Sequence, residues 1–261
     1  MPRPRLAVWK FASCDGCQLQ LLDLEADLLA LADRVEIAHF LEASSRVLPG
    51  PYDVSLVEGS ISTPRDLDRI REIRARSATL VAIGACAVAG GVQAARNTAS
   101  LAAFAAAVYP RPEALSVLET STPVSAHVPV DLELRGCPIS GAQVLDAILA
   151  LLAGRPARPA TGPQCAECKA AGTVCVTVAH GTPCLGPVTR AGCGNLCPKV
   201  GRGCYGCFGP AEGANLPAMA AQLRALGLGP REVRDAFRGF NAAAPEFAAA
   251  AAAAETEAPD G

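Results

Sequence analysis

The sequence lacks the features that mark several large classes of protein. Lysines are few and the arginines are scattered, so there is no basic block of the kind that drives binding to nucleic acids or membrane surfaces. The net charge is only −2. Neither a phosphate-binding loop nor an H-E-x-x-H pattern occurs, which leaves flavin or nicotinamide binding by this chain without support.

Recognisable export and membrane signals are also missing. Residues 1–11 include basic side chains, but the neighbouring apolar stretch is short and is interrupted by Lys10, Cys14 and Asp15. No twin-arginine pattern is present. The most apolar later stretch, residues 80–92, is rich in glycine and shorter than the roughly 20 residues that span a bilayer. We therefore expect a soluble, cytoplasmic protein that does not bind membranes.

What the sequence does have is twelve cysteines in 261 residues, of which 51% are apolar. Such a chain can form one large domain or two modest ones with a sizeable core. In a reducing compartment, clustered cysteines are more often metal ligands than disulfides. Twelve cysteines also make three sets of four, and four is the usual number of cysteine ligands of an iron–sulfur cluster.

Up to about residue 155, strand-like and helix-like segments alternate. The pattern predicts strands at residues 6–9, 35–40, 54–57, 80–83 and 131–134, and helices at residues 18–32, 65–76 and 141–152. Thr63 and Pro64 have the positions of a helix cap and a first helical residue. This alternation predicts an α/β domain over residues 1–155, with a flavodoxin-like, doubly wound parallel sheet.

The remainder has a different character. Residues 155–163 contain three prolines and are typical of a linker. Between residues 165 and 210 there are eight cysteines, many glycines and almost no periodicity, so this segment needs metal sites to hold it together. We expect a small, irregular domain over residues 164–240, with one helix at 217–226. The alanine-rich tail, 241–261, has helical propensity but little to bury, and disorder is expected there.

Four cysteines follow predicted strands of the first domain. Cys14 and Cys17 form a C-x-x-C pair shortly after the first strand, while Cys86 and Cys137 follow two later strands. The carboxyl ends of parallel strands share one edge of the sheet, where ligands bind. We therefore expect these four thiols to converge there on a 4Fe-4S cluster. The alternative is that they are two buried core thiols and a redox dithiol.

The other eight cysteines begin and end with C-x-x-C pairs. They are Cys165, Cys168, Cys175, Cys184, Cys193, Cys197, Cys204 and Cys207. One grouping takes the first four as one site and the last four as another, but spacing alone does not fix this partition. Two four-cysteine zinc sites are equally compatible with the spacing. The site of the first domain favours electron transfer.

Several short motifs now give a specific resemblance. They are Ser13-Cys14-Asp15-Gly16-Cys17-Gln18-Leu19-Gln20, Glu58-Gly59-Ser60, Gly84-Ala85-Cys86-Ala87, Gly90-Gly91, Arg96-Asn97, Gly136-Cys137-Pro138, Cys184-Leu185-Gly186-Pro187-Val188-Thr189, Cys193, Cys197-Pro198 and Cys204-Tyr205-Gly206-Cys207. Together they resemble the small subunits of nickel–iron hydrogenases over about residues 5 to 215, in unbroken order. The resemblance is closest to the delta subunits of cytoplasmic NADP-dependent hydrogenases, also called sulfhydrogenases.

This resemblance implies an electron-relay subunit with three 4Fe-4S clusters and no catalytic residue of its own. The implied ligands are Cys14, Cys17, Cys86 and Cys137 for a proximal cluster, Cys193, Cys197, Cys204 and Cys207 for a medial cluster, and Cys165, Cys168, Cys175 and Cys184 for a distal cluster. Implied partners are a large subunit with the nickel–iron site and NAD(P)-reductase subunits that contain flavin and iron–sulfur clusters.

Two positions depart from the periplasmic members of that family. Those proteins use a histidine as the first distal ligand, where this chain has Cys165, and they lack a fourth medial cysteine, where this chain has Cys197. Both differences favour three all-cysteine clusters over a relay that contains a three-iron cluster. The resemblance thus implies a relay of low potential, which suits exchange of electrons with a nicotinamide.

Other interpretations stay open. Hydrogenases that serve a deazaflavin or a heterodisulfide reductase are close rivals, and a zinc-stapled structural protein is a rival of another class. The related quinone-reductase subunit resembles only the first domain and uses adjacent cysteines, which this chain lacks. Glu58 could relay protons, contact a partner or form an ordinary loop hydrogen bond. His180 is expected at the surface or near a cluster rather than as a ligand.

Overall fold

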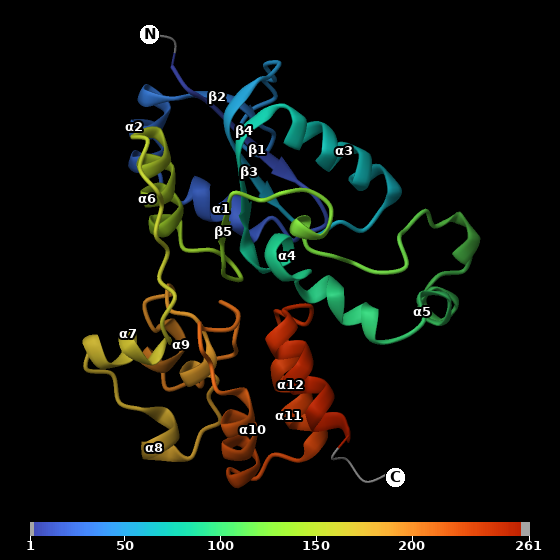
Figure 1. Cartoon of the computed structure of the whole chain (residues 1–261), viewed down its shortest axis with the longest axis vertical. Coiled ribbons are helices and arrows are strands. Elements are labelled where there is room, and N and C mark those ends of the chain that lie inside the picture. Colours follow the sequence, from blue (N-terminus) through green and yellow to red (C-terminus); the bar gives the residue numbers. More distant parts are fainter. Residues whose placement is uncertain (1–2, 257–261) are drawn as a thin grey trace. The chain divides into compact units, whose positions relative to one another are not determined.

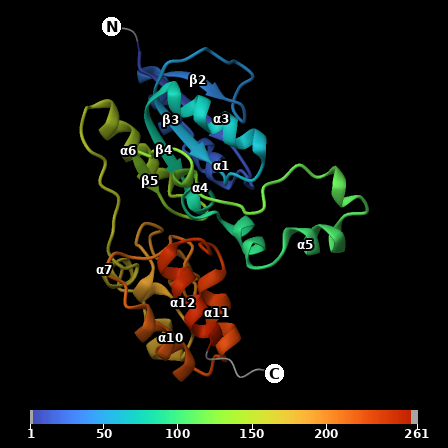
Figure 2. The same cartoon turned by 45° about the vertical axis from the view of Figure 1, so that its right-hand side comes forward.

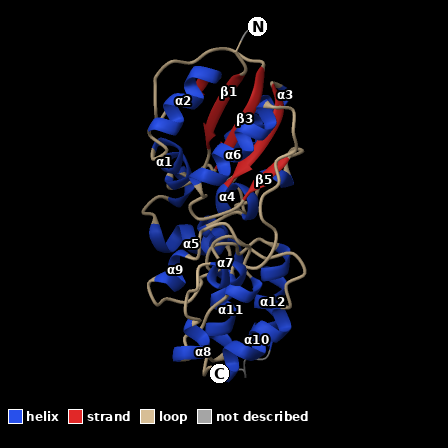
Figure 3. Cartoon of the chain, turned by 90° about the vertical axis from the view of Figure 1, so that its left-hand side faces the viewer, coloured by secondary structure: helices blue, strands red, loops and turns tan. Residues whose placement is uncertain are grey.

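Five apolar segments of the first part of the chain pair into one sheet in the computed structural model, which describes residues 3–256 (Figure 1). The strands are β1 (Arg5–Lys10), β2 (Glu36–Phe40), β3 (Tyr52–Glu58), β4 (Ser77–Ile83) and β5 (Leu132–Leu134). Their order is β2-β1-β3-β4-β5, and every neighbouring pair is parallel. They lie side by side as the red arrows of Figure 3. This is the flavodoxin-like order, and the predicted fold class is confirmed.

Helices cover both faces of the sheet, as a doubly wound fold requires. Buried residues of α1 (Gly16–Leu22), α2 (Ala26–Arg34) and α6 (Gly141–Leu152) share one core with the strands. Residues of α3 (Pro64–Ala75) and α4 (Gly84–Ala89) share another core with the opposite face. The strands are therefore apolar on both sides, which is why they appear in the sequence as continuous apolar runs.

The start of α3 follows from its sequence. The Thr63 hydroxyl accepts a hydrogen bond from the Asp66 N–H at 3.1 Å, and the Asp66 carboxylate accepts one from the Thr63 N–H at 2.9 Å. Pro64 occupies the first turn, where its missing N–H has no partner to lose. This capping box fixes where the chain enters the helix, and the helix start predicted at Thr63 is confirmed.

One predicted helix, residues 18–32, is instead two helices. The chain breaks between α1 and α2, where Glu25 has a φ of 46°. In a continuous helix, Leu21 and Leu31 would point about 80° apart, because ten residues at 3.6 per turn do not complete a whole number of turns. The break allows both leucines to enter the same core, where each is at most 3% exposed.

A long excursion separates α4 from β5. It contains η1 (Val92–Thr98), α5 (Leu101–Val108), η2 (Pro112–Ala114) and η3 (Val124–Ala126), and α5 is drawn far from the sheet in Figure 2. The Asn97 amide closes the excursion on itself, since it donates to the Ser121 carbonyl at 2.8 Å and accepts from the Ser121 N–H at 2.8 Å. The excursion is tied to the rest of the fold next to Ser121, where the Ile61 N–H donates to the Thr122 carbonyl at 2.9 Å. The short β5 strand then completes the sheet.

The chain divides into two compact units, Met1–Arg158 and Pro159–Gly261, and the division falls within residues 155–163. Named helices of the second unit are α7 (Cys165–Ala170), α8 (Val176–His180), α9 (Leu196–Lys199), α10 (Leu216–Ala225), α11 (Pro230–Arg238) and α12 (Pro245–Thr256), with the short η4 (Gly186–Val188) between α8 and α9. The first three of these α-helices are short and lie among the cysteines, while the last three pack on one another. Within residues 3–256, no helix combines the length and apolarity needed to cross a membrane.

The prediction that the tail is disordered is wrong for residues Pro245–Thr256, which form α12. Residues 257–261 lie outside the described part of the chain. Phe247 is buried beside Phe237, with ring centroids 5.7 Å apart. Ala251 and Ala254 are also buried, because their small side chains allow the helix to approach its neighbours closely. Arg234 and Arg238 of α11 both pair with Glu255. The alanine pattern alone gave no sign of these partners.

We predict that Phe247→Ala destabilises the second unit by about 3–5 kcal/mol, the usual cost of removing a fully buried aromatic ring. The matched control is Ala248→Ser on the exposed side of the same helix, which should cost no more than about 0.5 kcal/mol. Urea unfolding followed by circular dichroism measures both variants. Equal unfolding curves for Phe247→Ala and the native chain would show that α12 does not dock.

Candidate metal centres

The four cysteines of the first unit lie at the carboxyl edge of the sheet. Cys14 and Cys17 are at the turn from β1 into α1, Cys86 lies in α4 directly after β4, and Cys137 follows β5. The pKa of the Cys86 thiol is raised to about 11, mainly by burial and to a smaller extent by the nearby Cys137 and Cys14. Burial likewise raises the pKa of Cys17, with Cys86 and Cys137 among its neighbours. The structure therefore brings these four thiols together.

Two glycines make room for these sulfurs. A Cβ on Gly84 would lie 2.4 Å from the Cys17 Sγ, and a Cβ on Gly91 would lie 2.5 Å from the Cys86 Sγ. Both glycines have positive φ angles, +83° and +63° respectively. Any other residue would meet both a strained backbone and a sulfur atom. The positions are thus restricted to glycine by the thiols themselves.

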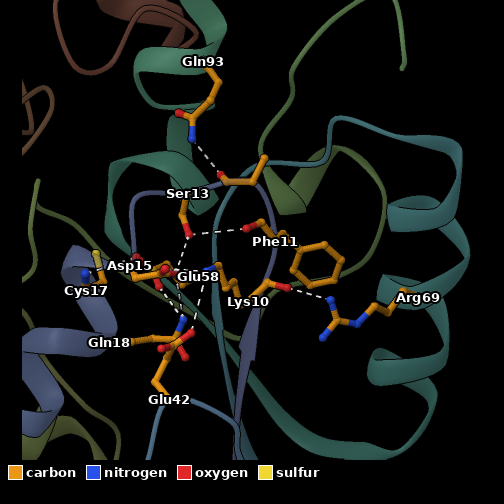
Figure 4. A network of polar contacts seen from close by, with 11 residues as sticks. Lys10, Phe11, Ser13, Asp15, Cys17, Gln18, Glu42, Glu58, Arg69 and Gln93 are labelled. Carbon is orange, nitrogen blue, oxygen red and sulfur yellow. Dashed lines mark hydrogen bonds and ion pairs between the residues drawn. The ribbon is translucent and has the colours of Figure 1, made fainter. Parts of the chain in front are cut away.

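Glu58 is the buried carboxylate of this site, only 2% exposed (Figure 4). Its Oε1 accepts a hydrogen bond from the Cys17 N–H at 3.1 Å, and its Oε2 accepts one from the Gln18 Nε2 at 2.8 Å. Burial raises the pKa of Glu58, while these two hydrogen bonds lower it. The carboxylate holds the first turn of α1 against the end of β3 and so fixes where Cys17 lies.

Gln93 supports the site from the other side. Its Nε2 donates to the Ala12 carbonyl at 2.7 Å (Figure 4). Its Oε1 lies 3.4 Å from the Cys86 Sγ. The side chain thereby ties the segment before Cys14 to the thiol of Cys86. Asp15, between the two cysteines of the first pair, forms an ion pair with Lys10.

In the second unit, three further cysteines lie near Cys165. Burial raises the pKa of its thiol, and Cys184, Cys168 and Cys175 are each close enough to raise it as well. A Cβ on Gly186 would lie 3.3 Å from the Cys184 Sγ and 3.4 Å from the Cys165 Sγ, so this glycine also faces sulfur. The first four cysteines of the segment therefore form one group.

The last four cysteines lie in two neighbouring pairs. Cys193 is beside Cys197, and Cys204 is beside Cys207. Burial raises the pKa of Cys204 to about 12. The Cys204 N–H also donates to the Cys184 Sγ at 3.1 Å, so the two groups of cysteines adjoin at this point. His180 lies at the exposed end of α8, in agreement with its expected place at the surface.

These thiols suit a bound cluster. A buried thiol with a raised pKa keeps its proton, and metal coordination is what turns it into a thiolate. Within the described residues 3–256, no three histidine, cysteine, aspartate or glutamate side chains meet in the way that would hold a single metal ion. A four-iron cluster takes one cysteine at each of four irons, and four is the number of thiols that the first unit brings together.

Three supporting residues were missed at the level of sequence. Gln164 is 1% exposed and its Nε2 lies 3.3 Å from the Cys168 Sγ. Asn241, also buried, donates from Nδ2 to the carbonyls of Gly206 and Cys207 at 2.9 and 3.2 Å. Glu167 bonds to the loop around Cys193. Gln164 and Glu167 had a signal, since polar residues flank the C-x-x-C pair, whereas Asn241 lies 34 residues from Cys207 and had none.

Comparison with known proteins supports this picture. The family model described as "NADH ubiquinone oxidoreductase, 20 Kd subunit" matches residues 14–151. Sulfhydrogenase 2 subunit delta of Pyrococcus furiosus is 37% identical over 236 residues, which cover 90% of this chain and 98% of that protein. A subunit of the vhu F420-non-reducing hydrogenase of Methanocaldococcus jannaschii is 32% identical over 251 residues, covering 85% of this chain and 87% of that protein.

A solved structure is similar as well. One chain of an NAD+-reducing [NiFe]-hydrogenase in the H2-reduced state is 28% identical, with a TM-score of 0.55, and the match covers 60% of this chain and 94% of that chain. The family model ends before the eight later cysteines, but the two relatives extend across them. The chain therefore belongs to the family of the NADH ubiquinone oxidoreductase 20 Kd subunit, and within it to the small subunits of hydrogenases.

Proposed function

We propose that this chain is the electron-relay subunit of a nickel–iron hydrogenase and holds three 4Fe-4S clusters. The observation that carries the proposal is the convergence of four thiols at the carboxyl edge of the sheet, with glycines where any Cβ would strike a sulfur. In this proposal the site acts through a bound cluster and not through a catalytic side chain. Its chemistry is the transfer of single electrons, which iron–sulfur clusters supply when bound.

Each proposed cluster has four cysteine ligands. Cys14, Cys17, Cys86 and Cys137 hold the proximal cluster, Cys193, Cys197, Cys204 and Cys207 the medial cluster, and Cys165, Cys168, Cys175 and Cys184 the distal cluster. The gathering of three cysteines around Cys165 supports the distal set. The close pairs Cys193 with Cys197 and Cys204 with Cys207 support the medial set.

Other residues hold these ligands in place. Glu58 fixes the backbone of Cys17, Gln93 lies against the sulfur of Cys86, and Asn241 anchors the Gly206 and Cys207 carbonyls. N–H groups aimed at sulfur, such as that of Cys204 toward Cys184, stabilise the negative charge of a ligated thiolate. Burial and hydrogen bonding to sulfur are the means by which a protein sets the potential of such a cluster.

The proposed partners come from what the relatives are. Hydrogenase small subunits act with a large subunit, and bond-making with hydrogen would take place on that partner at its nickel–iron site. The similarity to an NAD+-reducing hydrogenase favours reductase subunits with flavin, further iron–sulfur clusters and a nicotinamide, NAD or NADP, as the final acceptor. A cytoplasmic location remains a prediction.

A second acceptor has its own support. The 32% identity to a subunit of an F420-non-reducing hydrogenase extends over 85% of this chain, including the second unit. The printed name of that relative says that it does not reduce F420, which is a deazaflavin, so among the alternatives it favours a heterodisulfide-reductase-linked complex over a deazaflavin-linked one. Assay of the purified complex with hydrogen and each acceptor in turn separates the two.

We predict that Gly84→Ala prevents assembly of the proximal cluster, because the new methyl group would lie 2.4 Å from the Cys17 Sγ. Gly154→Ala is the control, since Gly154 in the same unit has a φ of +66° but nothing within 4 Å of its Cβ position. Both substitutions strain the backbone by about 1 kcal/mol, but only the first meets a sulfur atom. Iron and sulfide per chain are measured for both, and equal losses would refute a steric role for Gly84.

We further predict that Cys197→Pro converts the medial site into a three-iron cluster, because it removes one thiolate and leaves Cys193, Cys204 and Cys207. Cys197→Ala should give the same result without the added proline, and Val200→Ala at the exposed end of α9 should not. Electron paramagnetic resonance of oxidised samples detects the three-iron signal. Its absence from both Cys197 variants, with the other clusters intact, would contradict the assignment of Cys197.

A further inference from the structure

One carboxylate links the two groups of cysteines in the second unit. Glu167 lies between Cys165 and Cys168 on α7, yet its side chain reaches the loop that carries Cys193. Its Oε1 accepts a hydrogen bond from the Gly192 N–H at 3.0 Å, and its Oε2 accepts one from the Asn195 N–H at 3.2 Å. The Oε2 atom is also 3.9 Å from the Cys193 Sγ. The carboxylate therefore holds the backbone on both sides of Cys193.

Asn195 completes this connection in the opposite direction. Its Nδ2 donates to the Thr173 Oγ1 at 2.7 Å and to the Glu167 carbonyl at 3.4 Å. The residue is 1% exposed and has a φ of 53°, a left-handed conformation that asparagine accepts more readily than most residues. The loop of residues 192–195 is thus tied to residues 167–173 by four hydrogen bonds from three donor groups.

We propose that Glu167 is a positioning residue that fixes the Cys193 loop on α7 and keeps the reduction potential of the Cys193 site low. This inference rests on the proposed function. A carboxylate that accepts two backbone N–H groups cannot swing away from its position, so its negative charge stays beside the Cys193 sulfur. Reduction adds an electron to the neighbouring cluster, and a fixed negative charge opposes that addition.

The Glu167 carboxylate also fixes the position of the proposed distal ligands relative to the proposed medial ligands. α7 supplies Cys165 and Cys168 to the distal set, and the loop supplies Cys193 to the medial set. Apolar packing contributes little to this relation, because α7 has no buried residue of its own. The hydrogen bonds of the Glu167 side chain, and not apolar packing, therefore hold α7 and the Cys193 loop together.

The test uses the intact hydrogenase complex and redox titration of each cluster by electron paramagnetic resonance. Glu167→Gln keeps the size of the side chain and one acceptor but removes the charge, and we expect the medial couple to shift upward with the proximal couple unchanged. Glu167→Ala should shift it further or lose the medial cluster, which lowers the iron content by about four per chain. Glu167→Asp keeps the charge and should stay closer to the native value.

The matched control is Glu246→Gln on the exposed side of α12, which makes the same change of charge away from the cysteine segment and should leave every couple in place. An unchanged medial couple in Glu167→Gln with full cluster content would overturn the inference. Loss of the proximal cluster together with the others would also overturn it, because the effect would then be on folding. If the native second unit held no iron–sulfur cluster, the proposed function itself would fail.

Discussion

The rest of the structure is arranged around groups of cysteine thiols that lie close together, and a thiol in apolar surroundings keeps its proton until a metal binds it. Cys17, Cys86 and Cys204 all have pKa values raised by burial, which means that their surroundings disfavour the thiolate. Metal coordination removes this penalty, since the ligated thiolate is neutralised by the cation it binds. In the proposed function, the cysteines are therefore the part of the structure whose stability is tied to a cofactor.

The two units meet this constraint in different ways. In the first unit a conventional α/β fold, with a core on both faces of the sheet, places four cysteines at one edge. In the second unit the cysteine segment buries few apolar side chains, among them Leu185, Val188 and Phe208, and helices α10 and α12 pack against it. Phe247 lies beside Gly206, and Asn241 donates hydrogen bonds to the Gly206 and Cys207 carbonyls, so both residues hold the loop between Cys204 and Cys207.

The features that could be predicted from the sequence are those that neighbouring residues along the chain determine. The apolar runs of β1, β3 and β4, the Thr63 cap and the position of each first-unit cysteine after a strand could all be predicted, because strands and caps depend on local pattern. The features that could not be predicted are those that depend on contacts with residues distant in the sequence. The break at Glu25 depends on where the core lies, and α12 depends on the aromatic and charged residues of α11 that receive it. Glu167 and Asn241 act on residues 25 to 35 positions away.

The most direct test of the central claim is the content of iron, zinc and acid-labile sulfide in the protein purified without oxygen. Three clusters with all-cysteine ligation predict about twelve iron and about twelve sulfide per chain. About two zinc with little iron would contradict the account, because the second unit would then be a zinc-stapled domain rather than part of an electron relay.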